Sequence, residues 1–213
     1  MPSRSDFVHR PLPCSLVNEF NLRLFQFFSA TDPTATSIAV ARFFAEELIW
    51  AVPLSLTCAW LWGDAKLKRA ALEAALAGGL ALAVAQVFAL TWYHPRPFAA
   101  GFGPSLVEHV DDSSFPSDHL TLLGAVAVGL LLRRESLLIG VLLAVLSLPV
   151  AWARVYLRVH FPFDIVGGLT LGAAAAFALL VVGQPVVTLV FPLATRVYAF
   201  VFGPMIRRGW VRP

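Results

Sequence analysis

The chain has 213 residues, of which 58% are hydrophobic and only 14% are charged. An ordinary soluble domain carries about 25% charged residues, so this composition excludes a typical soluble enzyme, and the high apolar content excludes a disordered chain. The formal net charge is +3. The basic residues cluster between apolar runs, which indicates membrane topology and no nucleic-acid partner. Cys14 and Cys58 are too few for a disulfide framework.

Apolar runs approach the roughly 20 residues that a membrane-spanning helix needs. They predict an all-α, polytopic helical bundle in one domain, 1–213, with its core at about 40–183 and peripheral segments at 1–35 and 184–213. Residues 16–28 are typical of an amphipathic helix at the membrane interface. The segment 185–206 is apolar but interrupted by prolines, and is either a sixth span or another interfacial segment. The five predicted spans are 43–62, 70–92, 117–132, 136–153 and 163–183.

Clusters of basic residues indicate which ends of the spans face the cytoplasm. They follow the first, third and fifth spans, and these ends lie on one side of an alternating bundle. The other side, which receives the loop 93–116 and the connection 154–162, is therefore expected to be extracytoplasmic. Five spans place the N-terminus on that outer side as well, and a sixth would reverse the assignment. The clusters are Lys66, Lys68 and Arg69; Arg133 and Arg134; and Arg207, Arg208 and Arg212.

Polar residues gather in three segments at the predicted outer ends of the spans. They read YHPRPF at 93–98, SSFPSDH at 113–119 and ARVYLRVHFPFD at 153–164. The planar fork of arginine suits bidentate phosphate binding. Pro116 is suited to the first turn of a helix, whose N-terminal N–H groups would bind an anion. The three segments therefore predict a phosphate site.

The third segment supplies a candidate nucleophile. His160 precedes a second proline-started helix, and Asp164 follows in or near its first turn. The carboxylate can hold one imidazole nitrogen and leave the lone pair of the other free to attack. His119 can protonate the departing oxygen. This pattern favours phosphoryl transfer through a histidine, with arginines neutralising the developing charge.

The same polar residues also allow other interpretations. A metal site is the alternative use of the cluster, since histidine and carboxylate are ordinary ligands, but the neighbouring arginines disfavour a divalent cation. Glu46 and Glu47 either have a functional role at membrane depth or pair with Arg42. The metal ligands would be His119, His160, Asp118 and Asp164, and the histidines interpreted as interfacial polar residues are His9, His94 and His109.

The three segments resemble the signature of the type 2 phosphatidic acid phosphatase (PAP2) superfamily over roughly residues 40–183, and in particular its bacitracin-resistance-type undecaprenyl-diphosphatases. The resemblance rests on Arg96-Pro97, on Pro116-Ser117 with His119, and on Arg154, His160 and Asp164 at the family's spacing. It implies that His160 is the nucleophile, Asp164 its orienting partner and His119 the general acid. Phosphate would be bound by Arg96, Ser117 and Arg154, without a metal or other cofactor.

The chain departs from the family pattern at four positions. Ala89 stands where the family has a lysine, Asp118 replaces a glycine, as in the bacitracin-resistance type, and Ala153 replaces a serine. Arg158 stands where a small residue is expected. One hypothesis is that Arg158 binds phosphate and partly replaces the missing lysine.

The resemblance implies a lipid-pyrophosphate phosphatase of the bacterial inner membrane with its site on the extracytoplasmic side. It would hydrolyse undecaprenyl diphosphate through a phosphohistidine while the polyprenyl tail stays in the bilayer. Three alternatives stay open: the same chemistry on phosphatidylglycerol phosphate, phosphatidate or a lipid A phosphate; a transporter or scaffold that lost the chemistry; and, least favoured by the composition, a haloperoxidase. The oligomeric state is left open.

Overall fold

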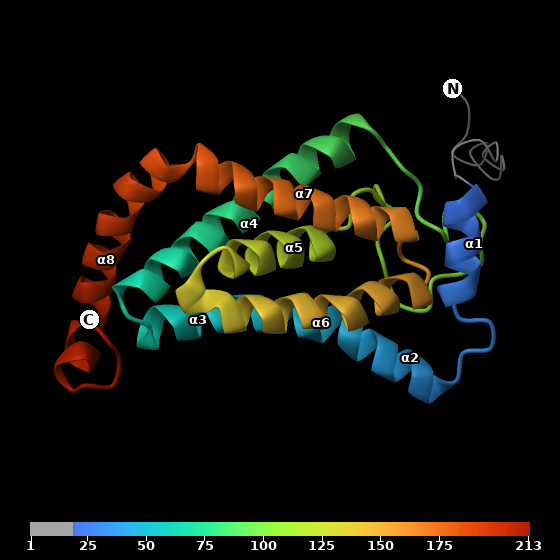
Figure 1. Cartoon of the computed structure of the whole chain (residues 1–213). Helices are drawn as coiled ribbons and strands as arrows, with labels where there is room; N and C mark the ends of the chain where they lie inside the picture. Colours follow the sequence, from blue (N-terminus) through green and yellow to red (C-terminus); the bar gives the residue numbers. More distant parts are fainter. Residues whose placement is uncertain (1–18) are drawn as a thin grey trace, which may run out of the picture.

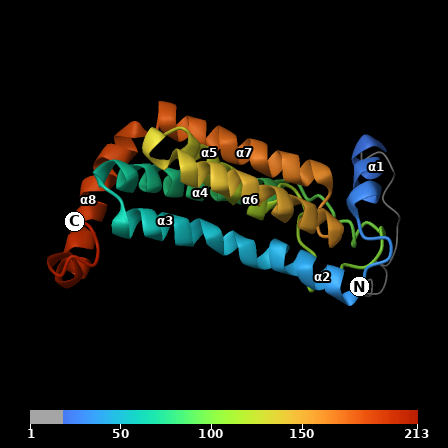
Figure 2. The same cartoon turned by 60° about the horizontal axis from the view of Figure 1, so that its bottom comes forward.

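The computed structural model describes residues 19–213, and its regular elements are all helical, as the composition predicts. Helices α4, α5, α6 and α7 and the α2–α3 stretch run side by side, while α1 and α8 lie across opposite ends of the bundle (Figures 1 and 2). We call the end that carries α1 the site end, and the end that carries α8 the far end. The helices are α1 (Glu19–Phe28), α2 (Ala35–Arg42), η3 (Phe43–Glu47), η4 (Leu48–Trp50), α3 (Ala51–Trp62), α4 (Ala65–Thr91), α5 (Asp118–Leu131), η5 (Arg134–Ser136), α6 (Leu137–Tyr156), α7 (Pro162–Val181) and α8 (Gln184–Arg207).

The first span begins earlier than the sequence predicts. The helical stretch starts at Ala35 instead of residue 43, because the side chain of Thr34 caps it by accepting a hydrogen bond from Ser37 N at 3.1 Å. It then continues to Trp62 through a π-helical turn, η3, and a 3₁₀ turn, η4. The apolar run 43–62 therefore predicts only the part of this helical stretch that follows α2.

Helix α5 is the central helix of the bundle. Its 14 residues rise only about 21 Å, and leucines along it, such as Leu120, Leu123 and Leu130, are fully buried among α4, α6 and α7. Gly168 and Gly172 of α7 let α5 approach closely. A methyl group at Gly168 would lie 2.7 Å from Ser117 O, and one at Gly172 would lie closer still to Thr121 O. Small residues of this kind let membrane helices pack backbone to backbone. The approach fixes the N-terminus of α5 against the start of α7.

The junction between α6 and α7 differs slightly from the predicted connection 154–162. Helix α6 continues to Tyr156, so Arg154 lies in its last turn, and the connection is reduced to residues 157–161. Helix α7 begins at Pro162, as predicted, with Phe161 as its N-cap. A proline at the first helical position costs no hydrogen bond, which is why the helix starts there.

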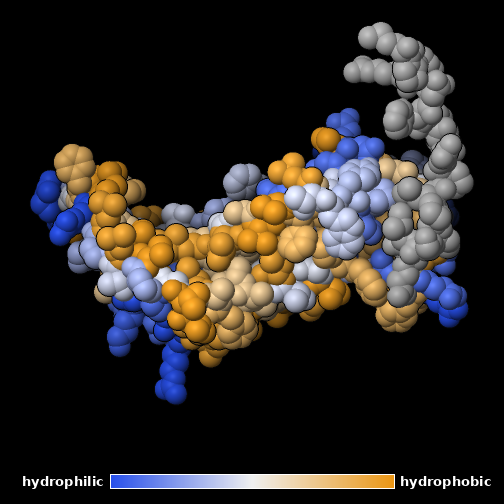
Figure 3. Space-filling model, turned by 90° about the horizontal axis from the view of Figure 1, so that it is seen from above, coloured by the Kyte–Doolittle hydropathy of each residue, from blue (hydrophilic) through white to orange (hydrophobic). Residues whose placement is uncertain are grey.

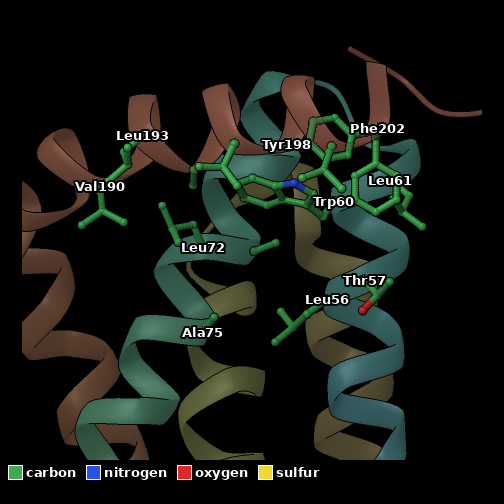
Figure 4. Close-up of a pocket in the computed structure, with 14 residues that line it drawn as sticks. Leu56, Thr57, Trp60, Leu61, Leu72, Ala75, Val190, Leu193, Tyr198 and Phe202 are labelled. Atoms are coloured by element: carbon green, nitrogen blue, oxygen red, sulfur yellow. The ribbon is translucent and has the colours of Figure 1, made fainter. Parts of the chain in front are cut away.

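Helix α8 lies across the far end and does not return through the bundle (Figure 1). Its length and composition would permit a span, but both of its ends contact the same end of the bundle. Gln184 Oε1 accepts from Arg69 at 3.2 Å, and beyond the helix Trp210 O accepts from Trp62 Nε1 at 3.0 Å. Helices α3, α4 and α8 enclose an apolar groove of about 640 Å³ (Figure 4). The course of α8 therefore favours the interfacial alternative for 185–206, while the α2–α3 stretch and α4 to α7 run along the bundle.

Helix α1 covers part of the site end. It buries Phe25, whose ring centroid is 5.2 Å from that of Phe161, and it leaves Phe27 79% exposed. One buried face and one exposed face agree with the predicted interfacial helix. Residues 16–18 of that prediction lie outside the described residues, as do His9 and Cys14. Figure 3 shows the apolar surface along the middle of the molecule, with hydrophilic residues gathered towards both ends.

Candidate active site

The three polar segments converge at the site end, although about 70 residues separate the first from the last. The long loop after α4 carries Arg96, whose Nη1 donates to Val159 O at 2.8 Å. The same loop meets His160, since Ser114 O lies 2.9 Å from His160 Nδ1. Finally, Ser117 N donates to Asp164 O at 3.1 Å. Hydrogen bonds to backbone oxygen atoms therefore join all three segments into one site.

His160 is buried with one ring nitrogen directed at two guanidinium groups. Because Ser114 O can only accept a hydrogen bond, Nδ1 carries the proton, and the lone pair of Nε2 faces Arg96 Nη1 at 3.3 Å and Arg154 Nη2 at 3.2 Å. Burial lowers the pKa of His160 well below 6.5, and the charges of Arg154 and Arg96 lower it further. A neutral imidazole with a free lone pair is the form that attacks phosphorus.

Asp164 holds the turn around His160 more closely than it holds the ring itself. Its Oδ2 accepts hydrogen bonds from the Ser114 hydroxyl and from Phe161 N, the latter at 2.7 Å. The same oxygen is 3.6 Å from His160 Nδ1. The sequence predicts that the carboxylate holds this nitrogen, whereas in the structure Ser114 O at 2.9 Å is the hydrogen-bond partner of Nδ1 and sets the tautomer. Asp164 acts on the ring mainly by fixing Ser114 and Phe161.

Buried donors without partners mark an anion site beside His160. Arg154 Nε and Ser117 Oγ are buried and have no hydrogen-bond partner among the described residues. Helix α5 begins at Asp118, directly after its N-cap Ser117. The N–H groups of its first turn have no acceptor within the helix. Unsatisfied buried donors are costly, and an oxygen-rich anion such as phosphate is a ligand that accepts from donors of this kind. We call Arg96, Arg154, Ser117 and the first turn of α5 the phosphate cradle.

Two further candidates lie on the first turn of α5. His119 is half-buried, and the charges of Arg154 and Arg96 reach it. Asp118 is exposed, and its Oδ2 lies 3.3 Å from Gln86 Nε2 of α4. Pro116 lies just before the N-cap instead of in the first helical turn. The expected helix N-terminus is nevertheless directed into the site.

Arg158 is placed apart from the phosphate cradle. Its guanidinium donates to Ala30 O at 2.5 Å and to Pro104 O at 3.4 Å, so it joins the α1–α2 connection to the long loop. Its backbone has a positive φ of 62°, which explains why a small residue is expected at this position. The hypothesis that it replaces the missing lysine gains no support from these contacts.

The two acidic candidates on η3, Glu46 and Glu47, differ in their surroundings. Glu46 Oε2 accepts from Arg42 Nε at 2.9 Å, which supports the pairing interpretation. Glu47 is exposed. As for the metal alternative, no cluster of three or more His, Cys, Asp or Glu side chains within residues 19–213 has an arrangement that would hold a metal ion.

Sequence reasoning missed two residues of the loop that contact the cradle. Asp112 Oδ1 lies 2.8 Å from both Arg96 Nε and Arg96 Nη2, and His109 Nε2 lies 3.2 Å from Arg154 Nη2. His109 was interpreted as an interfacial polar residue. The available signal was the position of the two residues, since both lie within the four residues that precede the segment 113–119. Their contacts depend on how the loop folds, which that signal does not give.

Comparisons with known proteins agree with this geometry. Residues 70–187 match the model of the PAP2 superfamily. The chain is 35% identical over 198 residues to the putative undecaprenyl-diphosphatase YbjG of Escherichia coli (strain K12), covering 92% of this chain and all of that protein. It is 31% identical to the undecaprenyl-diphosphatase BcrC of Bacillus subtilis (strain 168), over 65% of this chain and 71% of that protein.

A solved structure extends the similarity to the fold. The first transmembrane PAP2-type phosphatidylglycerolphosphate phosphatase from Bacillus subtilis superposes with a TM-score of 0.55 at 19% identity, covering 81% of this chain and 90% of that one. At this identity the likeness concerns the fold alone. Together with the matched family model, it shows that the chain belongs to the PAP2 superfamily and is a multi-pass membrane phosphatase of that family.

Proposed function

We propose that this protein hydrolyses undecaprenyl diphosphate to undecaprenyl phosphate and inorganic phosphate through a phosphohistidine at His160. The observation that carries the proposal is the buried His160, whose Nε2 lies within 3.3 Å of two guanidinium groups. The choice of lipid is supported by the names of the two relatives at 35% and 31% identity. The partners are thus a polyprenyl diphosphate and the surrounding bilayer.

The first step transfers the terminal phosphoryl group to the enzyme. Arg96 and Arg154 hold the phosphoryl oxygens, and the lone pair of His160 Nε2 attacks the terminal phosphorus. The bond from phosphorus to the bridging oxygen breaks, and its electron pair leaves on undecaprenyl phosphate. His119 is the group that gives a proton to that oxygen. Preorganised guanidinium groups stabilise the charge that spreads over the phosphoryl oxygens.

The second step releases inorganic phosphate. A water molecule attacks the phosphorus of the phosphohistidine and loses a proton to His119. The phosphorus–nitrogen bond breaks, its electron pair returns to His160 Nε2, and phosphate leaves. The hydrogen bond from Nδ1 to Ser114 O keeps the ring in place through both steps.

The site is proposed to face the extracytoplasmic side of a bacterial inner membrane. The support is the distribution of basic residues, since Lys66 and Arg134 lie near the far end, which would then be cytoplasmic. A cysteine placed at Val110 in a chain lacking Cys14 and Cys58 should react with a membrane-impermeant maleimide added outside intact cells. Reaction of a cysteine at Arg134 instead would reverse the orientation.

The function is tested with purified protein and undecaprenyl diphosphate labelled in its terminal phosphate. The wild type should release phosphate in the presence of EDTA and, after denaturing quench, carry label on histidine. His160→Ala should do neither, while Arg208→Ala, which removes a cation at the far end, should behave as the wild type. Release from phosphatidylglycerol phosphate, phosphatidate or lipid A phosphate alone would change the substrate. Undiminished release by His160→Ala would contradict the histidine mechanism, and absence of release from every lipid would favour a transporter or scaffold.

A further inference from the structure

His109 lies in the loop between α4 and α5 and faces the phosphate cradle. Its Nε2 is 3.2 Å from Arg154 Nη2, and its Nδ1 is 3.0 Å from Val110 O. The centroid of its ring is 6.5 Å from that of His160. The side chain is half-buried. His109 therefore contacts the guanidinium group that also contacts the nucleophile.

The hydrogen bonds fix which nitrogen of His109 carries the proton. Val110 O can only accept, so Nδ1 donates to it, and the lone pair of Nε2 accepts from Arg154. Burial lowers the pKa of His109, and the charges of Arg96 and Arg154 lower it further, against opposing effects of Val110 O and Asp112. At neutral pH the ring is a neutral acceptor that points at Arg154.

The two arginines of the cradle are held by different kinds of group. Besides its contact with His160 Nε2, Arg96 donates to oxygen atoms of Asp112, Val159 and Ser113. Arg154, in contrast, has two imidazole nitrogens as its hydrogen-bond acceptors among the described residues, those of His109 and His160, both reached from Nη2. When His160 Nε2 is bonded to phosphorus, it no longer has a lone pair to offer. His109 is then the acceptor that remains.

We propose that His109 is the positioning residue of Arg154, which holds the guanidinium group towards the phosphoryl group before and after His160 is phosphorylated. The second part of this inference, which concerns the phosphorylated enzyme, rests on the proposed phosphohistidine mechanism. The first part, the effect of His109 on anion binding, does not depend on the lipid. His109 itself makes or breaks no covalent bond.

The first experiment measures binding of inorganic phosphate to the full chain in detergent by titration calorimetry. His109→Phe keeps a ring beside Phe98 but offers no acceptor, and it should weaken phosphate binding about tenfold, the usual scale for losing one hydrogen bond to a charged group. His109→Gln, whose amide oxygen can accept from Arg154, should stay within threefold of the wild type. Val110→Ala is the matched control, because it changes a 74% exposed side chain and keeps the carbonyl group.

A purely structural role of the ring would give a different result. In that case His109→Phe would bind phosphate within twofold of the wild type, or His109→Phe and His109→Gln would lose affinity equally and unfold at equally lowered temperatures without phosphate. Either outcome would overturn the inference. The expected unfolding temperatures without phosphate are instead the same for all the variants.

The second experiment follows the labelled phosphohistidine during turnover. With Arg154 no longer held, His109→Phe should lower kcat and increase the fraction of enzyme that carries label at saturating substrate, because the water attack is slowed most. An unchanged labelled fraction would contradict the second part of the inference. If the wild type releases no phosphate from undecaprenyl diphosphate, the proposed substrate fails, while the phosphate affinities still decide the role of His109.

Discussion

Buried charged groups occur at both ends of the molecule, but the two ends satisfy them differently. At the far end Lys68 is 2% exposed, donates to Arg212 O at 2.8 Å and lies 4.4 Å from the centroid of the Tyr198 ring. At the site end Arg154 is 5% exposed, has no carboxylate partner among the described residues and leaves Nε unpaired. Lys68 has its hydrogen-bond acceptors within the protein, whereas Arg154 keeps a free donor that, under the proposed function, binds an anion.

This difference shows how one bundle separates stability from function. A buried charge whose partners are all in place contributes to a defined structure. A buried charge without such partners costs free energy, and active sites commonly bear this cost for the sake of the ligand. We therefore expect substitutions at the two ends to affect different measurements.

The largest expected effect is the loss of activity in Arg154→Gln. Removing one preorganised donor from the charge that develops in the transition state should lower kcat/KM by about 10²–10³. The unfolding temperature without phosphate should stay the same or rise, because an unpaired buried charge has been removed. Activity is measured with the labelled lipid and unfolding by a thermal shift. A clear fall in the unfolding temperature would show that Arg154 is a structural cation like Lys68.

The pH dependence of kcat/KM should reflect the buried state of His160. Because its pKa lies well below 6.5, the attacking neutral form should persist as the pH falls through 6.5. Activity should then decrease only at lower pH, by about tenfold per unit once the pKa is passed. Unfolding temperatures at each pH serve as the control for acid denaturation. A halving of kcat/KM at pH 6.5 or above, with the fold intact, would contradict a buried neutral nucleophile.

A smaller effect is expected from Glu73→Gln at the far end. Glu73 pairs with Arg69 at 3.2 Å and with Arg133 at 2.8 Å, and so joins α4 to the connection between α5 and α6. Both arginines are partly exposed, which weakens the pairs, so the loss should be about 1–2 kcal/mol. The unfolding temperature should fall by a few degrees while kcat/KM remains unchanged. A tenfold loss of kcat/KM at unchanged stability would mean that the far end takes part in catalysis.

The sequence allows the spans and the three polar segments to be predicted because both signals are local. Apolar length alone locates α4 to α7 within a few residues, and the spacing from Arg154 to Asp164 locates the junction of α6 and α7. The direction of α8 is not a local property. It depends on contacts such as the one between Trp210 and Trp62, which the apolar content of 185–206 does not reveal.

The site shows the same division between local and long-range information. The segments alone place His160 beside phosphate-binding groups, but they do not show that Ser114 O fixes its tautomer. Nor do they distinguish Arg154 from Arg158, two arginines on one short stretch. Only the path of the long loop, which brings His109 to one and Pro104 to the other, separates their roles.

Arg158→Gly should give the smallest effect and sharpen the contrast with Arg154. The variant loses the hydrogen bonds to Ala30 and Pro104, worth about 1 kcal/mol, but gains a similar amount because glycine accepts the positive φ without strain. Phosphate affinity should stay within twofold, and the unfolding temperature should change little. Arg158→Ala is the matched variant: it loses the same hydrogen bonds, keeps the strained backbone and should unfold at a lower temperature. A tenfold loss of phosphate affinity in both variants would mean that Arg158, after all, supplies the cation that Ala89 does not.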